Sequence, residues 1–181
     1  MKKKTIIILG IIFILIILLF QFGIQIGNVR IGKQIDLKTK QDYRFEQSNF
    51  YSDFYSKDDL IVLNLWATWR EPCVKEMPEL NSIKTLYKYE PVVFLSLSVD
   101  TDSLKLEKFN KTEKFKFNDI TFLDLKYKNA ILNTIENRKV DQWISSYSVP
   151  VTYLIKNKKV VAKFDGTVEK VELTNAIEKY K

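Results

Sequence analysis

The feature that most constrains this chain is an uncharged apolar run near its start, TIIILGIIFILIILLFQF, from Thr5 to Phe22. Extended to Ile26, the run is roughly 20 residues long, and a helix of that length spans the hydrocarbon core of a bilayer, about 30 Å. Three lysines at residues 2–4 precede the run. By the positive-inside rule they keep the N-terminus in the cytoplasm and send the rest of the chain across the membrane.

The sequence therefore predicts a basic cytoplasmic N-terminus at residues 1–4, a transmembrane signal anchor at 5–26, a spacer at 27–41 and a folded domain at 42–181. We expect a single-pass protein of the cell membrane, held in the lipid bilayer by its N-terminal helix, with the domain on the extracytoplasmic side. Two alternatives stay open, a cleaved signal peptide and a buried helix of a soluble protein. A cleavage site normally has a small-x-small pattern, and GIQIGNV after Phe22 is a poor version of it.

The chain has one cysteine and no histidine among its 181 residues. An intramolecular disulfide, a zinc site built from Cys and His, and a Ser-His-Asp or Cys-His catalytic arrangement are therefore excluded. Of the 29 basic residues three are at positions 2–4, which leaves 26 basic against 22 acidic residues in the rest of the chain. No segment concentrates the remaining basic residues, so nucleic-acid binding is not expected. We expect no metal and no cofactor.

The pattern of apolar residues after the spacer alternates between strand and helix signals. A continuous apolar run at 60–66 with a single Asn indicates a strand buried on both sides. The segment 157–159 between two apolar runs indicates a β-hairpin. Strands that alternate with helices predict an α/β domain with a mixed sheet. The expected strands are 42–46, 60–66, 92–99, 119–123, 151–155 and 160–164, and the expected helices are 48–57, 73–89, 100–115, 127–146 and 168–180.

The junction of the first strong strand and its helix reads NLWATWREPCVKEMPEL, residues 64–80. This segment resembles the thioredoxin superfamily, and within it the membrane-anchored TlpA/ResA-like thiol-disulfide oxidoreductases. VVFLSLSVD at 92–100, VPVTYLI at 149–155 and Gly166 continue the resemblance, which covers residues 42–181. It implies a thioredoxin-like fold, a mixed central sheet flanked by helices. The positions that match the motif are Asn64, Trp66, Ala67, Trp69, Pro72, Cys73, Glu76 and Pro78.

One position departs from the family pattern, because Arg70 stands where the family has its first active-site cysteine. In such enzymes that cysteine attacks a substrate disulfide and the second cysteine resolves the mixed disulfide. With Cys73 alone, dithiol exchange is ruled out. Whether the chain is an enzyme is left open: it is either a degenerate thiol-redox or cytochrome c maturation protein acting through one thiol, or a non-catalytic module that binds exported polypeptides. The resemblance implies cysteine-containing exported proteins as partners.

The resemblance places Arg70, Cys73 and Glu76 at the catalytic positions. Arg70 either points into solvent or attracts an anion and lowers the pKa of Cys73, and Cys73 is either a buried inert thiol or a usable one. Glu76 tunes the thiol, pairs with Arg70 or is solvated. The substrate-binding positions are Trp69, Pro72, Val149 and Pro150, with a cis bond expected before Pro150 and Trp66 expected in the core.

Overall fold

The computed structural model describes residues 24–26, 29–31, 44–112, 114–139 and 146–181. The chain divides into two compact units, residues 1–41 and 42–181. In the first unit β1 (Ile24–Ile26) pairs with β2 (Val29–Ile31) in an antiparallel hairpin. The structure thus differs from the expected transmembrane helix at residues 24–26, and the rest of that segment lies outside the described residues. Within the described residues no helix has the length and apolar character needed to cross a bilayer.

The second unit is built on a five-stranded mixed sheet, as predicted. Its strand order is β5-β4-β3-β6-β7, in which β3, β4 and β5 are parallel and β6 and β7 are antiparallel to their neighbours. The strands are β3 (Leu60–Trp66), β4 (Val92–Ser98), β5 (Asn118–Asp119), β6 (Val151–Lys156) and β7 (Lys159–Asp165). Because β3 is central and covered on both faces, all seven of its residues are buried, which explains its continuous apolar run.

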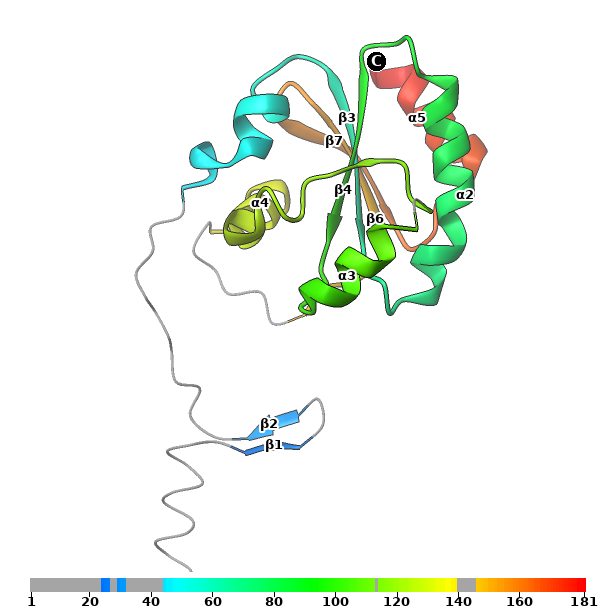
Figure 1. Ribbon diagram of the computed structural model, residues 1–181. Helices are drawn as coiled ribbons and strands as arrows, with labels where there is room; N and C mark the ends of the chain where they lie inside the picture. The colour runs from blue at the N-terminus through cyan, green and yellow to red at the C-terminus, as the bar shows by residue number, and fades with distance from the viewer. Residues whose placement is uncertain (1–23, 27–28, 32–43, 113, 140–145) are drawn as a thin grey trace, which may run out of the picture. The chain divides into compact units, whose positions relative to one another are not determined.

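Helices cover both faces of this sheet (Figure 1). On one face α2 (Glu71–Leu86) lies beside α5 (Lys170–Tyr180), and Leu80 and Ile83 of α2 share one core cluster with Leu173 and Ile177 of α5. The other face is covered by η1 (Phe45–Gln47), η2 (Tyr51–Tyr55) and α4 (Lys128–Ile135), which pack on the second core cluster. The remaining helices are α3 (Ser103–Asn110) and η3 (Leu125–Tyr127). This is the predicted thioredoxin-like layering.

Several predicted elements are shorter than expected or of a different kind. The predicted edge strand at 42–46 is wrong from residue 45, where η1 begins and Phe45 packs against the rings of Tyr51 and Tyr55. The predicted strand at 119–123 ends after Asp119, whose Oδ1 accepts the backbone N–H of Thr121 at 3.0 Å and turns the chain. The helix predicted at 100–115 ends at Asn110, and the one predicted at 127–146 ends at Ile135.

The predicted hairpin is confirmed, and two further local features follow from single residues. Asp102 caps α3 by accepting the backbone N–H of Lys105 at 3.0 Å. The hairpin between β6 and β7 turns through Asn157 and Lys158, both with positive φ, as two-residue hairpin turns require. Gly166, with φ of 88°, ends β7.

Candidate functional site

The candidate site lies where β3 ends and α2 begins. Arg70 is the N-cap residue of α2, with extended backbone and no side-chain capping bond, and the helix starts at Glu71. Pro72 occupies the first turn, where a missing N–H breaks no helical hydrogen bond. The backbone N–H of Cys73 donates to the carbonyl of Arg70 at 3.0 Å. Arg70 and Cys73 therefore sit in one turn at the start of the helix.

A buried carboxylate fixes the loop that leads into this turn. Asp100, 6% exposed at the end of β4, accepts the backbone N–H of Thr68 at 2.8 Å and the Thr68 hydroxyl at 2.7 Å. The Ser98 hydroxyl donates to the same carboxylate at 2.6 Å. The sequence does not predict this role of Asp100. Its position could have indicated this role, because it follows β4, the strand that pairs with β3, and so lies at the same edge of the sheet as the loop after β3.

Arg70 reaches across from the helix to the loop before β6. Its Nε donates to the backbone carbonyl of Val149 at 3.1 Å, and the Val149–Pro150 bond is cis, as predicted. The Arg70 side chain is exposed, yet one of its donors is fixed on the loop. Val149 and Pro150 are both buried. The structure therefore brings together Arg70 and the loop of Val149 and Pro150, which the sequence placed 79 residues apart.

Cys73 is enclosed beneath this arrangement. It is 1% exposed and packs in the core cluster that contains Trp66, Ala67 and Met77. Burial is the main cause that raises the pKa of Cys73 to about 11; the backbone of Ala67 and the charge of Arg70 lower it by less, and Glu76 raises it further. The thiol is therefore both covered and protonated at neutral pH.

Glu76 follows one helical turn after Cys73 and is also buried, at 7% exposure. Its Oε1 accepts an N–H of the Asn64 amide at 3.1 Å, and the same amide donates to the Thr152 hydroxyl at 3.0 Å. Its Oε2 has no hydrogen-bond partner among the described residues. Burial raises the pKa of Glu76 to about 7, while Asn64 and the nearby Val168 backbone lower it by less. Glu76 is neither solvated nor paired with Arg70, so two of the three expectations for it are wrong.

The two tryptophans of the motif differ in burial, and Trp66 lies in the core as predicted. Trp66 is 1% exposed in the core, and Trp69 is 58% exposed beside Arg70 in the chain. Pro72 is half-buried. Exposed aromatic surface next to a fixed guanidinium is a combination suited to polypeptide contacts.

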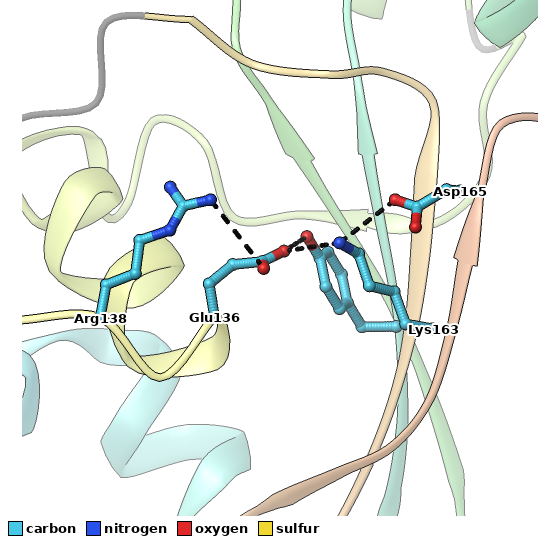
Figure 2. A network of polar contacts seen from close by, with 5 residues as sticks. Glu136, Arg138, Lys163 and Asp165 are labelled. Atoms are coloured by element: carbon cyan, nitrogen blue, oxygen red, sulfur yellow. Dashed lines mark hydrogen bonds and ion pairs between the residues drawn. The ribbon is translucent and has the colours of Figure 1, made fainter.

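A polar network that the sequence does not predict surrounds Tyr153 on the strand after Pro150 (Figure 2). The Tyr153 hydroxyl on β6 donates to Glu136 at the end of α4, and Lys163 on β7 lies 3.2 Å from carboxylate oxygens of both Glu136 and Asp165. Arg138 is 4.0 Å from the other oxygen of Glu136. A pocket of about 90 Å³ lies next to these side chains and residues 146–148. No local pattern joins these residues, because they come from three elements.

Residues 31–164 match the AhpC/TSA family. The chain belongs to this family. It is 31% identical over 134 residues to the thiol-disulfide oxidoreductase ResA of Geobacillus kaustophilus, covering 72% of this chain and 67% of that protein. It is 33% identical over 123 residues to a ResA of Bacillus cereus, covering 66% of this chain and 62% of that protein. It is thus a TlpA/ResA-like member of the thioredoxin superfamily, and the match spans about two thirds of these relatives.

A solved structure supports the fold of this AhpC/TSA family member. The crystal structure of a thiol:disulfide interchange protein of the thioredoxin family from Chlorobium tepidum TLS superposes with a TM-score of 0.53 at 15% identity, covering 68% of this chain and 81% of that one. Among the described residues, no group of three or more His, Cys, Asp or Glu side chains could hold a metal ion. The chemistry available at the site is one covered thiol, one buried carboxyl and one fixed guanidinium.

Proposed function

We propose that this chain is a membrane-anchored, extracytoplasmic protein whose degenerate motif no longer performs dithiol exchange and instead binds exported polypeptides. The observation that carries the proposal is Cys73, which is the lone thiol of the chain, 1% exposed, and lies in the turn that Arg70 begins. The ResA proteins are named thiol-disulfide oxidoreductases. This chain keeps the family fold. At the position of the first active-site cysteine it has Arg70, which bonds to Val149 instead of attacking a disulfide.

The chemical argument against exchange has two steps. Release of a mixed disulfide needs a second thiol, and the chain has none. Formation of the mixed disulfide needs a thiolate, and with a pKa of about 11 the thiolate fraction at pH 7 is on the order of one in ten thousand. Burial also blocks the approach of a substrate disulfide. Monothiol chemistry is therefore disfavoured as well.

The argument for polypeptide binding rests on what the site still presents. Within the described residues the terminal nitrogens of Arg70 make no hydrogen bond or ion pair, and its Nε is held on Val149. Four donors of a guanidinium that is held through its Nε are thus presented one residue along the chain from the exposed Trp69. A planar cation beside an aromatic surface suits an extended polypeptide with carboxylate or carbonyl acceptors. Exported polypeptides fit because the sequence predicts the domain outside the cytoplasm.

The test combines activity with binding, on the full chain in detergent. We expect no reduction of insulin by dithiothreitol above background, and we expect Arg70→Cys to restore turnover. A fluorescent, reduced and carboxymethylated polypeptide should bind, and Trp69→Ala and Arg70→Ala should each weaken binding roughly tenfold. Val171→Ala, at an exposed position on α5, is the matched control and should leave binding unchanged.

Two results would overturn the proposal. Catalytic turnover by the unmodified chain would show that Arg70 does not disable the motif. Reducible adducts between Cys73 and exported proteins would establish a monothiol function in place of binding. The location is tested separately, because protease added to spheroplasts should digest the domain, and full protection would place it in the cytoplasm.

A further inference from the structure

Three large apolar side chains are exposed together just after β5. Phe122 is 46% exposed, Leu123 is 62% exposed and Leu125 is 52% exposed. Large apolar side chains elsewhere on the described surface are exposed singly or farther apart in sequence. Isolated exposed side chains are ordinary, whereas an apolar cluster that neighbouring elements do not cover marks a contact surface. We call residues 122–125 the apolar loop.

The apolar loop is held rigidly rather than loosely. Between its exposed members lies Asp124, which is fully buried. One Asp124 carboxylate oxygen accepts the backbone N–H of Asn49 at 2.8 Å, and the other accepts that of Phe50 at 2.7 Å. Turn hydrogen bonds from Asp124 to Ile120 and from Tyr127 to Asp124 fix the loop on either side. The exposure of the apolar side chains is therefore a constant feature of the fold.

The partners of the loop place it beside the point where the chain enters the domain. Asn49 is five residues after Arg44, the first described residue of the second unit. Its side-chain amide donates to the carbonyl of Leu123 at 3.1 Å. The chain that precedes Arg44 leads back to the uncharged run at Thr5–Phe22. The apolar loop is thus bonded to the segment that continues the tether, the chain between the predicted membrane anchor and Arg44.

We propose that the apolar loop inserts into the surface of the bilayer that holds the anchor, and so fixes the orientation of the domain on the membrane. This inference rests on the anchor in the proposed function. The tether keeps the lipid surface at a high effective concentration next to the loop, so a small apolar contact suffices. The exposed Lys126, whose ammonium lies 4.9 Å from the centre of the Tyr127 ring, supplies a positive charge next to Leu125 for anionic headgroups.

A protein partner fits the loop less well than lipid does. Three side chains bury roughly a few hundred Å² of surface, whereas a stable protein interface buries about 800 Å² on each partner. Lipid imposes no such minimum, because acyl chains and headgroups adapt to the shape of a small insertion. The depth is limited to the boundary between headgroups and acyl chains, roughly 5–10 Å, as for other interfacial apolar faces.

The experiment uses the full chain reconstituted into vesicles of equal parts phosphatidylethanolamine and phosphatidylglycerol. In a Cys73→Ser background, Leu123→Cys carries an NBD fluorophore, and Val171→Cys, at a 70% exposed position on α5, carries it in the matched control. We expect dithionite to reduce the label at position 123 roughly tenfold more slowly than the label at 171. A third variant, Lys126→Glu, should reduce that protection.

The outcomes separate the loop from the anchor. If the chain stays with the vesicles after alkaline carbonate extraction but both labels are reduced equally fast, the loop proposal is wrong and the anchor stands. If carbonate releases the chain, the anchor is wrong and the loop proposal falls with it. Protection at 123 that rises with the ratio of protein to lipid would show contact between copies of the chain, which also overturns insertion into lipid.

Discussion

Two buried carboxyl groups in this domain have different surroundings. Asp124 is fully buried, and each of its oxygens accepts a backbone N–H, from Asn49 at 2.8 Å and from Phe50 at 2.7 Å. Glu76 is 7% exposed, and within the described residues only one of its oxygens is bonded, to Asn64. A buried carboxylate is stable where donors meet it and otherwise takes up a proton. Asp124 is therefore a structural acceptor, whereas Glu76 changes its charge near neutral pH.

The strongest test of this comparison removes the well-bonded carboxylate. Asp124→Ala leaves the buried N–H of Phe50 and the N–H of Asn49 without their acceptors. Because unpaired buried donors lose their full solvation, we expect the free energy of unfolding to fall by about 4 kcal/mol at pH 7. Urea unfolding followed by tryptophan fluorescence measures this loss.

The matched control is Asp58→Ala, which removes an exposed carboxylate from the segment before β3. Its effect should stay within about 0.5 kcal/mol, as for other surface changes. If Asp124→Ala lowers the free energy of unfolding as little as the control does, then water replaces the lost carboxylate. The bonds to Asn49 and Phe50 would then not distinguish Asp124 from Glu76.

The second test addresses the carboxyl with an unpaired oxygen. The pKa of Glu76 rises from its ordinary value of 4.5 to about 7 in the fold. The folded chain therefore binds more protons than the unfolded chain between pH 4.5 and 7, and its stability falls as the pH rises through that window. The shift corresponds to a loss of roughly 3 kcal/mol between the two ends of the window.

Glu76→Gln keeps an oxygen for Asn64 and removes the charge. We expect the variant to lack this part of the pH dependence, so that it gains stability relative to the parent from about pH 4.5 to about pH 8. Urea unfolding at a series of pH values measures the difference. Glu172→Gln, at an exposed position on α5, should run parallel to the parent. A constant difference between Glu76→Gln and the parent at every pH would contradict a raised pKa.

The sequence predicts best those elements whose signal lies within one short segment. The strand at 60–66 has its predicted bounds, because a run that is apolar apart from one Asn needs cover on both faces. The hairpin of β6 and β7 was predicted because Asn157 and its neighbours tolerate a tight turn. Such elements carry their signal within a few residues.

The candidate site was predicted in its residues but not in its contacts. The motif located Arg70, Cys73 and Glu76, yet whether Arg70 bonds to Val149, 79 residues away, depends on how two elements pack. The burial of Glu76 depends in the same way on Asn64 and Thr152, which lie on β3 and β6. Asp124 gave no signal at all, because its partners are about 75 residues distant. Long-range hydrogen bonds of this kind have no local period or spacing.

The smallest of the three expected losses of stability comes from removing one hydrogen-bond donor from a third buried carboxylate, so that one of its oxygens is left unbonded, like Oε2 of Glu76 within the described part of the chain. Asp100 is buried like Asp124, and one of its oxygens accepts from the Thr68 hydroxyl at 2.7 Å, while the other accepts from Ser98 and the Thr68 N–H. Thr68→Val keeps the shape of the side chain and removes the hydroxyl, so that one Asp100 oxygen loses its donor. Because a hydrogen bond to a charged group is worth about 2 kcal/mol, we expect a loss of that size in the free energy of unfolding at pH 7.

Thr68→Ser retains the hydroxyl and should recover most of the stability, which urea unfolding of the two variants side by side would show. Equal losses in both variants would mean that the methyl group of Thr68, rather than its hydrogen bond to Asp100, fixes the loop before α2.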